Sequence, residues 1–305
     1  MINLLLREKN YYKEKNMKIG INLPPVTRQE SASKWLYDFA DAGYQAVEFD
    51  ADMFPLITGG KLERRWLPVL KKLLSDYSFT YTMHIGYGVD LRSEDDFETH
   101  RNTLFSSIEA AAESGCVLLN LHYEKQSPSL RIEERFLESH IEAAEFAEKL
   151  GLTLAIENIE VEYADPVIDF VKKVNRKNFV LNYDTGHGFL ASSYIGFDYL
   201  DSIRKSAPLL GHLHISDNTG IFEPLRITNR SVYDSLPMGY RIALGRGDIH
   251  IPPLWGKIPY EEIFKILKNY DGIVLCEFNA ELYRPFLKQI RQDIESLIAG
   301  TRSQK

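Results

Sequence analysis

Short segments rich in β-forming residues recur along the chain at a spacing of about 30 residues, the length of a strand followed by a helix. Each segment ends where the sequence turns polar, so each is predicted to be one strand. The predicted strands are residues 19–23, 46–50, 79–84, 117–122, 153–157, 179–184, 210–214 and 273–277.

Amphipathic helical patterns fill the intervals between these strands. They include residues 31–43, 97–115 and 132–151, and each ends in a glycine, a signal for a helix C-terminus before the next strand. A last helix is predicted near residues 283–299. Strands that alternate with helices and have no internal linker favour a single-domain α/β protein, the (β/α)8 TIM barrel.

The alternative to a barrel is an open, doubly wound sheet with an appended segment. Such sheets often bind nucleotides through a glycine-rich turn after the first strand. Here Pro24 and Pro25 stand at that position, which disfavours a nucleotide-binding fold.

The domain limits follow from the same pattern. Residues 17–300 are predicted to form the barrel, and residues 1–16 are expected to be either a poorly ordered extension or no part of the natural protein, with Met17 as its first residue. A long loop, 215–258, exceeds the usual length of a connection and is expected to act as a lid or binding segment. It contains arginines, of which Arg241 and Arg246 are candidate contacts for an anionic group of a substrate, although a solvated position is the simpler interpretation for any one arginine.

Composition narrows the class of partner. The 305 residues carry a formal net charge of -7, so the chain lacks the basic surface typical of duplex-binding proteins, and no nucleic-acid partner is expected. No apolar run approaches the length of a membrane span, and the first residues lack the features of a secretory leader. The two cysteines, Cys116 and Cys276, are far apart and fit a reducing compartment, so the protein is expected to be cytoplasmic.

The predicted strands share one chemical feature, because seven of them finish in an ionisable side chain. These residues are Asp50, His84, His122, Glu157, Asp184, His214 followed by Asp217, and Glu277. Active sites of TIM barrels lie at the carboxyl ends of the strands, so the seven side chains are expected to face one mouth. Carboxylates gathered in this way repel one another unless a cation compensates them.

Three of the carboxylates, Glu157, Asp184 and Glu277, together with His214, therefore predict a site for one divalent metal ion, with Mn²⁺, Co²⁺, Mg²⁺ and Zn²⁺ all left open. For Asp184 the alternative is a helix cap, because Thr185 and Gly186 follow it as a turn would.

The remaining histidines divide by their position in the predicted elements. His212 should point the same way as His214 but one layer deeper, which suggests packing or hydrogen bonding within the barrel. His100 and His140 fall inside predicted helices and are expected at the surface. His250, in the long loop, is left open.

At these residues the sequence resembles the xylose-isomerase-like TIM-barrel superfamily, which holds sugar isomerases and epimerases together with endonuclease IV. The resemblance runs from Met17 to about Ala299. Its motifs are HIGYGVDLRS (84–93), LLNLHY (118–123), IEN (156–158), YDTGHG (183–188), HLHISDN (212–218), LGRGDI (244–249) and CEF (276–278).

The resemblance implies a four-ligand metal site of Glu157, Asp184, His214 and Glu277. It implies that His187 contacts substrate, as in the epimerases, or a second metal, as in endonuclease IV. His84 and His122 match two further metal ligands of endonuclease IV, but many sugar isomerases of the superfamily keep similar histidines.

Two departures limit the resemblance. Endonuclease IV has an Asp-x-His element before its LGxG segment that completes a three-metal site, whereas this chain has Tyr240 and Ile242 there, which puts a third metal in doubt. Sugar 3-epimerases have an arginine six residues after the matching histidine, whereas this chain has Gly220.

The function expected from the resemblance is a metal-dependent isomerase or epimerase of a small sugar, a sugar phosphate or a related hydroxycarbonyl compound, through a metal-stabilised enediolate. Glu157 and Glu277 would exchange the proton. The alternative is an endonuclease-IV-like phosphodiesterase acting on abasic DNA. The expected partner is a small carbohydrate-like substrate, with no membrane and with a homo-oligomer as an open option.

Overall fold

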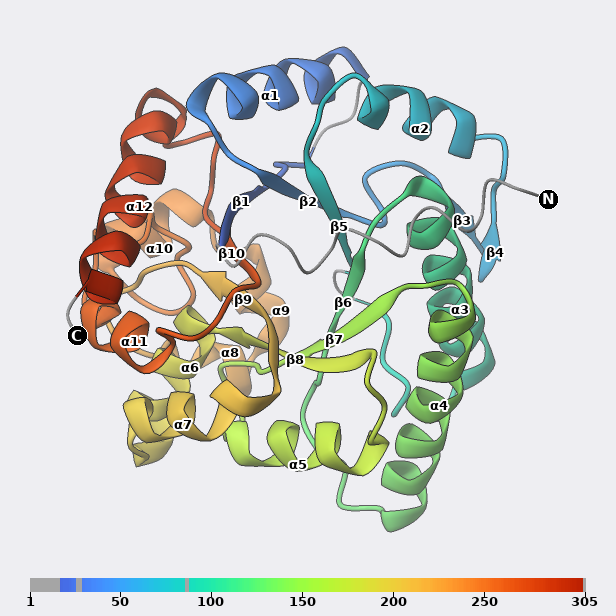
Figure 1. Ribbon diagram of the computed structural model, residues 1–305. Coiled ribbons are helices and arrows are strands. Elements are labelled where there is room, and N and C mark those ends of the chain that lie inside the picture. Colours follow the sequence, from blue (N-terminus) through green and yellow to red (C-terminus); the bar gives the residue numbers. More distant parts are fainter. Residues whose placement is uncertain (1–16, 26–28, 86–87, 304–305) are drawn as a thin grey trace.

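The computed structural model describes residues 17–25, 29–85 and 88–303, so the prediction for residues 1–16 lies outside the described part. Within it, parallel strands close into a barrel surrounded by helices (Figure 1). All eight predicted strands are confirmed, with ends shifted by at most a few residues. They are β1 (Lys18–Asn22), β2 (Ala46–Asp50), β5 (Thr80–His84), β6 (Leu118–His122), β7 (Thr153–Glu157), β8 (Phe179–Asp184), β9 (Leu210–Ile215) and β10 (Ile273–Cys276).

The barrel closes through β1, which pairs in parallel with β10 on one side and β2 on the other. The order around the barrel is β1-β10-β9-β8-β7-β6-β5-β2, so β2 and β9 are not neighbours and meet only across the interior. This closed order confirms the predicted single-domain TIM barrel and excludes the open sheet.

Helices cover the outside of the barrel. The larger ones are α1 (Gln29–Ala42), α2 (Leu67–Ser75), α3 (Phe97–Ser114), α4 (Leu130–Lys149), α5 (Ala164–Val174), α6 (Thr185–Ala191), α7 (Tyr199–Ser206), α11 (Tyr260–Ile266) and α12 (Leu287–Ser303). Gly115 ends α3 in the left-handed conformation with φ 84°, as its glycine predicted. The last helix begins at Leu287 rather than near residue 283, because a 3-10 turn containing a proline, Arg284–Phe286, precedes it.

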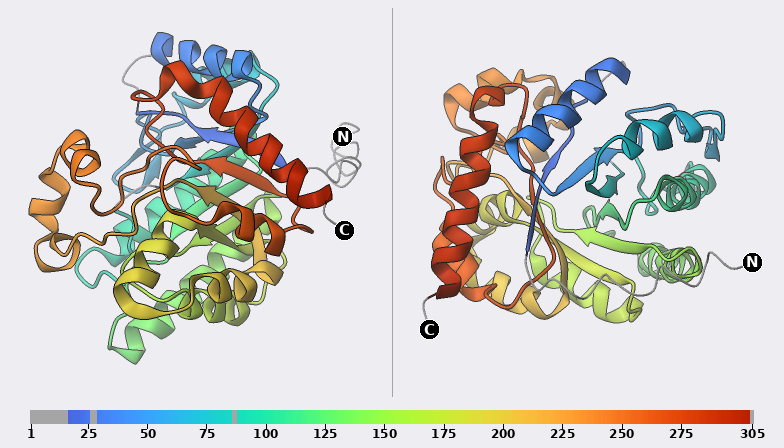
Figure 2. Two further views of the ribbon diagram at one scale, coloured as in Figure 1. Left: turned by 90° about the vertical axis from the view of Figure 1, so that its left-hand side faces the viewer. Right: turned by 45° about the horizontal axis from the view of Figure 1, so that its top comes forward.

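The segment predicted as a long loop, 215–258, contains three short helices that the sequence pattern did not reveal. They are α8 (Leu225–Thr228), α9 (Arg230–Ser235) and α10 (Met238–Leu244). Figure 2 shows them in orange, projecting from the barrel at the end opposite to the chain's C-terminus. We call this segment the excursion. Its two ends are joined by an isolated bridge between Asp217 and Ile251.

Polar side chains occupy much of the barrel interior, where branched apolar residues are usual. Glu48, Thr82, Asn120, Asn182 and His212 are all buried there. The apolar core lies mainly between the strands and the helices that cover them. None of the described helices is long and apolar enough to cross a membrane.

Candidate active site

The residues at the end of β8 show how one side chain serves two purposes. Asp184 caps α6, since its Oδ1 accepts a hydrogen bond of 2.5 Å from the backbone N–H of His187. Its Oδ2 is buried and has no hydrogen-bond partner. The helix-cap interpretation is therefore correct for one oxygen, and the second oxygen remains available to a ligand.

The structure brings the four predicted ligands together at the mouth of the barrel. Glu157, Asp184, His214 and Glu277 each offer an atom within 4.8 Å of the others. His214 Nδ1 lies 2.9 Å from Glu277 Oε2 and 3.3 Å from Glu157 Oε2. This spacing suits one divalent cation held by oxygens and a single imidazole nitrogen.

Two adjoining groups have the same ligand chemistry. His84 and His122 face Glu157, with Nε2 atoms 3.7 and 3.8 Å from its carboxylate oxygens. The other group is His187, Asp248 and His250. Since Glu157 Oε1 is also 3.3 Å from His187 Nδ1, all three groups meet around this glutamate.

Asp248 and His250 correct an expectation from the sequence. The sequence has Tyr240 and Ile242 before the LGRG segment, where endonuclease IV has its Asp-x-His element. The structure instead supplies Asp248 and His250 from just after that segment and places them beside His187. The Asp-x-His pattern is present in the sequence as DIH (248–250), but only the fold of the excursion shows that Asp248 and His250 reach the mouth of the barrel.

Hydrogen bonds to backbone carbonyls orient both histidines of this group. His187 Nδ1 lies 3.0 Å from the Asn158 carbonyl oxygen, and His250 Nδ1 lies 2.8 Å from that of Glu277. When each Nδ1–H donates there, Nε2 carries the lone pair. The Nε2 atoms lie 3.4 and 2.6 Å from Asp248 Oδ2, so the three side chains form one cluster with the chemistry of metal ligands.

Burial and the nearness of other ionisable groups shift the pKa values of the side chains at the mouth. Burial raises the pKa of Asp184 to about 7, with His187 opposing the rise and Glu157 adding to it. Burial also lowers the pKa of His122 to about 4, so this ring is neutral and able to bind a metal. Although burial alone would raise the pKa of Glu277, the neighbouring His214 holds it below its ordinary value.

Unpartnered polar atoms test whether the residues fit a cation. Buried atoms without a hydrogen-bond partner include Glu157 Oε1, Asp184 Oδ2, Asp248 Oδ1 and His84 Nε2. Such atoms are costly unless something satisfies them. Their chemistry, carboxylate oxygen and imidazole nitrogen, is that of a divalent-metal site, so the residues fit the predicted group.

Glu157 is held rigidly from below. Its Oε2 accepts hydrogen bonds from the side-chain amides of Asn120 and of Asn182, the latter at 2.8 Å. With Oε2 pinned in this way, Oε1 points towards His122 and His187, at 3.8 and 3.3 Å. The predicted role of His212 inside the barrel is also matched, because its Nε2 lies 3.2 Å from Glu48 Oε2.

The arginines of the excursion are engaged in different ways. Arg241 donates to the Tyr233 hydroxyl at 3.0 Å and to the Asp248 carbonyl at 3.2 Å, so it ties down the chain beside the site. Arg246 is exposed. Arg226 forms an ion pair with the buried Glu160 and is itself partly buried. An anion contact by Arg241 or Arg246 stays a prediction.

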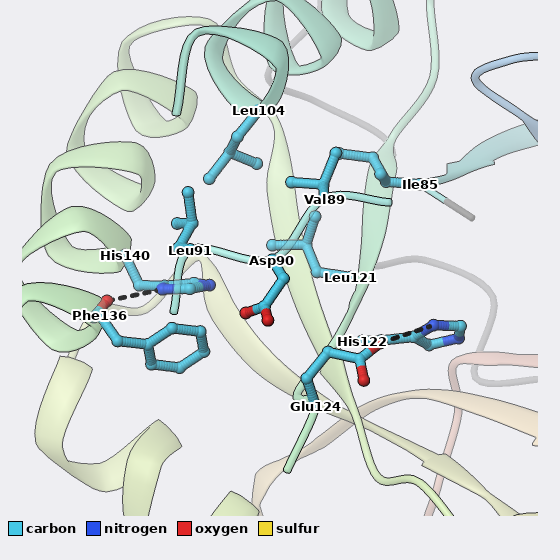
Figure 3. A pocket seen from close by; sticks show the side chains of 10 residues that line it. All are labelled: Ile85, Val89, Asp90, Leu91, Leu104, Leu121, His122, Glu124, Phe136 and His140. Carbon is cyan, nitrogen blue, oxygen red and sulfur yellow. Dashed lines mark hydrogen bonds and ion pairs between the residues drawn. The ribbon is translucent and has the colours of Figure 1, made fainter. Parts of the chain in front are cut away.

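A small cavity lies beside the mouth, between β6 and α4 (Figure 3). His122 and Glu124 border it on one side, and His140 and Phe136 on the other. The expectation that His140 lies at the surface is wrong: it is 3% exposed, and its Nδ1 lies 2.7 Å from the Phe136 carbonyl oxygen. The apolar face of α4 turns inward at this position, which its helical pattern alone did not show.

Together, the barrel and its mouth define a TIM-barrel protein with a candidate metal site at the carboxyl ends of its strands. The sequence profile of one family, the xylose isomerase-like TIM barrel, matches residues 36–299, and the chain belongs to that family.

Comparisons with individual proteins agree with this assignment. D-psicose 3-epimerase of Agrobacterium fabrum (strain C58 / ATCC 33970) is 29% identical over 153 residues, which cover 48% of this chain and 39% of that protein. The match thus spans well under half of the epimerase. The structure of D-psicose 3-epimerase from Clostridium cellulolyticum H10 has a TM-score of 0.65 at 20% identity, covering 94% of this chain and 99% of that one. An L-ribulose 3-epimerase has a TM-score of 0.67 at 18% identity, covering 94% and 96%. At these identities the two structures support the fold.

Proposed function

We propose that this protein is a divalent-metal-dependent isomerase or epimerase of a small sugar, a sugar phosphate or a related hydroxycarbonyl compound. The observation that carries the proposal is the pair Glu157 and Glu277. Glu157 ends β7, Glu277 directly follows β10, and both approach the same atom, His214 Nδ1. The names of the similar proteins, all sugar epimerases, support the same class of reaction.

The residues at the mouth would have two roles, metal binding and proton transfer. A divalent cation bound by Glu157, Asp184, His214 and Glu277 would supply Lewis-acid polarisation of a substrate carbonyl. One glutamate removes the proton from the carbon next to that carbonyl, and the other returns a proton. Return at the opposite face of the same carbon gives an epimer, and return at the neighbouring carbon gives an isomer.

The two glutamates differ in access. The Glu277 side chain is 19% exposed, whereas that of Glu157 is fully buried and pinned by two amides. We therefore infer that Glu277 exchanges its proton more readily with substrate entering from the mouth. His187, held by the Asn158 carbonyl, orients a substrate oxygen.

Deuterium exchange tests the proposal even when the product is unknown. Ketoses and their phosphates are incubated with the Mn²⁺- or Co²⁺-loaded protein in D2O, and NMR follows deuterium entering next to the carbonyl. Glu157→Gln and Glu277→Gln should each abolish the exchange. Glu138→Gln, on the exposed face of α4, is the matched control and should leave it unchanged. Exchange that persists in both site variants with metal bound would show that these glutamates are not the acid and base.

A second candidate is a phosphodiesterase related to endonuclease IV, and a specific observation favours it. The groups His84–His122–Glu157 and His187–Asp248–His250 offer ligands for further cations beside the first. Neighbouring cations clamp the attacking and leaving oxygens of a phosphodiester. The net charge of -7 is unfavourable for DNA binding, which is why this function ranks second.

Elemental analysis separates the candidates, because one tightly bound metal atom per chain favours the isomerase and three favour the phosphodiesterase. Asp248→Asn adds a functional test. Under the first proposal it should reduce sugar turnover without abolishing it, because Asp248 acts there only through its contact with His187. Under the second proposal it should abolish nicking of an abasic duplex.

A further inference from the structure

A buried glutamate lies one layer beneath the candidate metal site. Glu48 comes from the middle of β2, is 2% exposed and reaches across the barrel interior towards β9. Thr82 donates its hydroxyl hydrogen to Glu48 Oε2 at 2.8 Å, and His212 Nε2 lies 3.2 Å from the same oxygen. The other oxygen, Oε1, lies 3.0 Å from His214 Nε2. Glu48 therefore touches a candidate metal ligand from below.

The two nitrogens of His214 have different surroundings. Nδ1 faces the site, between Glu157 and Glu277. Nε2 faces away from it and has no aligned hydrogen bond, although the Glu48 carboxylate is within reach. An imidazole that binds a cation through Nδ1 keeps its proton on Nε2, and that N–H needs an acceptor. Glu48 is the carboxylate positioned to accept it.

Packing does not account for a glutamate here. An ionised carboxylate buried in a barrel interior is costly unless it is paired, and apolar residues normally fill this layer. Thr82 and His212 occupy only Oε2, so they hold Glu48 in place while Oε1 remains directed at His214. This division of the two oxygens is what a side chain needs in order to orient a neighbouring ligand.

We propose that Glu48 is a positioning residue that orients His214 and makes its Nδ1 a stronger ligand for a divalent cation. The inference rests on the metal site of the proposed function and adds to it the residue that prepares the nitrogen ligand. Glu48 itself touches neither the cation nor the substrate. Its removal should weaken metal binding even though every direct ligand is retained.

A titration with Co²⁺ in competition with a chromophoric chelator tests this role. Glu48→Gln keeps the size of the side chain but removes its charge, and it should lower the Co²⁺ affinity by about 10- to 100-fold, as is typical when an outer partner of a metal ligand is lost. The visible absorption of bound Co²⁺ should also change, because the His214 ring is less firmly oriented. Thr82→Val is the matched control: it removes a donor from Oε2, leaves the contact with His214, and should change the affinity little.

Three results would overturn the inference: Glu48→Gln binding Co²⁺ with wild-type affinity and spectrum, an equal loss in Thr82→Val, or no Co²⁺ binding by the wild-type protein. If Glu48→Gln does not fold, NMR of the Zn²⁺-loaded wild-type protein decides instead, since His214 must then carry its proton on Nε2. A proton on Nδ1 would refute the role. If no sugar is turned over, the proposed function fails, while the titration still decides the role of Glu48.

Discussion

Acid should destabilise this protein through a histidine outside the mouth, His140. The ring is buried in α4, with centroids 4.2 Å from Phe136, 5.1 Å from Phe170 and 6.0 Å from Phe179. Burial lowers its pKa from 6.5 to about 4, and the charge of Arg92 acts in the same direction. The folded protein therefore keeps this ring neutral at pH values where the unfolded chain protonates it.

The sign and size of the effect follow from linkage. Above pH 6.5 His140 is neutral in both the folded and the unfolded state, so it adds no pH dependence to the stability. Below pH 6.5 His140 becomes protonated in the unfolded state but stays neutral in the folded state. Stability is thus lost as the pH falls from about 6.5 towards 4, by about 3 kcal/mol in all and about 2 kcal/mol by pH 5. For a chain of this length the latter corresponds to a fall in Tm of about 3 °C.

Urea unfolding of the wild type and of His140→Gln, near neutral pH and at about pH 5, isolates this contribution. The variant loses packing at every pH, so the informative quantity is the difference between the two pH values. The wild type should lose about 2 kcal/mol more than the variant over this range. Equal pH dependence in the two proteins would show that His140 accepts a proton in the folded state, and it would refute the reasoning.

Three further outcomes are expected. Gly188→Ala should lower the free energy of unfolding by about 1–3 kcal/mol, because the added Cβ would fall 2.4 Å from the Tyr183 hydroxyl. In the control Gly239→Ala the added Cβ meets nothing within 4 Å, so this variant should be as stable as the wild type or more stable. An unchanged urea midpoint for Gly188→Ala would contradict the prediction. Arg226→Met should lower the free energy of unfolding by about 3–5 kcal/mol, since it leaves Glu160 buried without its partner. In thermal melting, Arg226→Lys should lower the Tm less than Arg226→Met does. Treatment with a chelator should lower the Tm of metal-loaded protein. Adding Co²⁺ or Mn²⁺ at a concentration 1,000 times the Kd should raise the free energy of unfolding of the chelator-treated protein by about 4 kcal/mol. An identical Tm with and without metal would argue against a structural cation.

The strands and their chemistry could be predicted from the sequence because both are local. Each strand is a short β-rich run, and the last residue of a run is the one that faces the mouth of a barrel. Glu157, Asp184, His214 and Glu277 could therefore be grouped from the order of the residues alone, and the structure places them within 4.8 Å of one another.

The features that the sequence did not reveal depend on long-range packing. The role of Glu48 could not be predicted because it depends on a contact across the barrel between β2 and β9, which are not neighbouring strands. His140 was hidden because the pattern of α4 leaves open which of its polar residues turns inward. Asp248 and His250 were hidden because they lie in a connection of irregular structure, where no period fixes the direction of a side chain.

The excursion is better understood as a wall of the site than as a lid over it. Its ends are bridged at Asp217 and Ile251, and the Tyr233 hydroxyl in α9 accepts from the backbone N–H of Asp248 at 3.3 Å. The short helices thus fix the position of Asp248, and through it the third ligand group. A barrel with the same strand ends but a shorter connection would keep the four-ligand site and lose this group. The choice between hydroxycarbonyl and phosphodiester chemistry therefore depends on the excursion, while the metal site common to both depends on the strands.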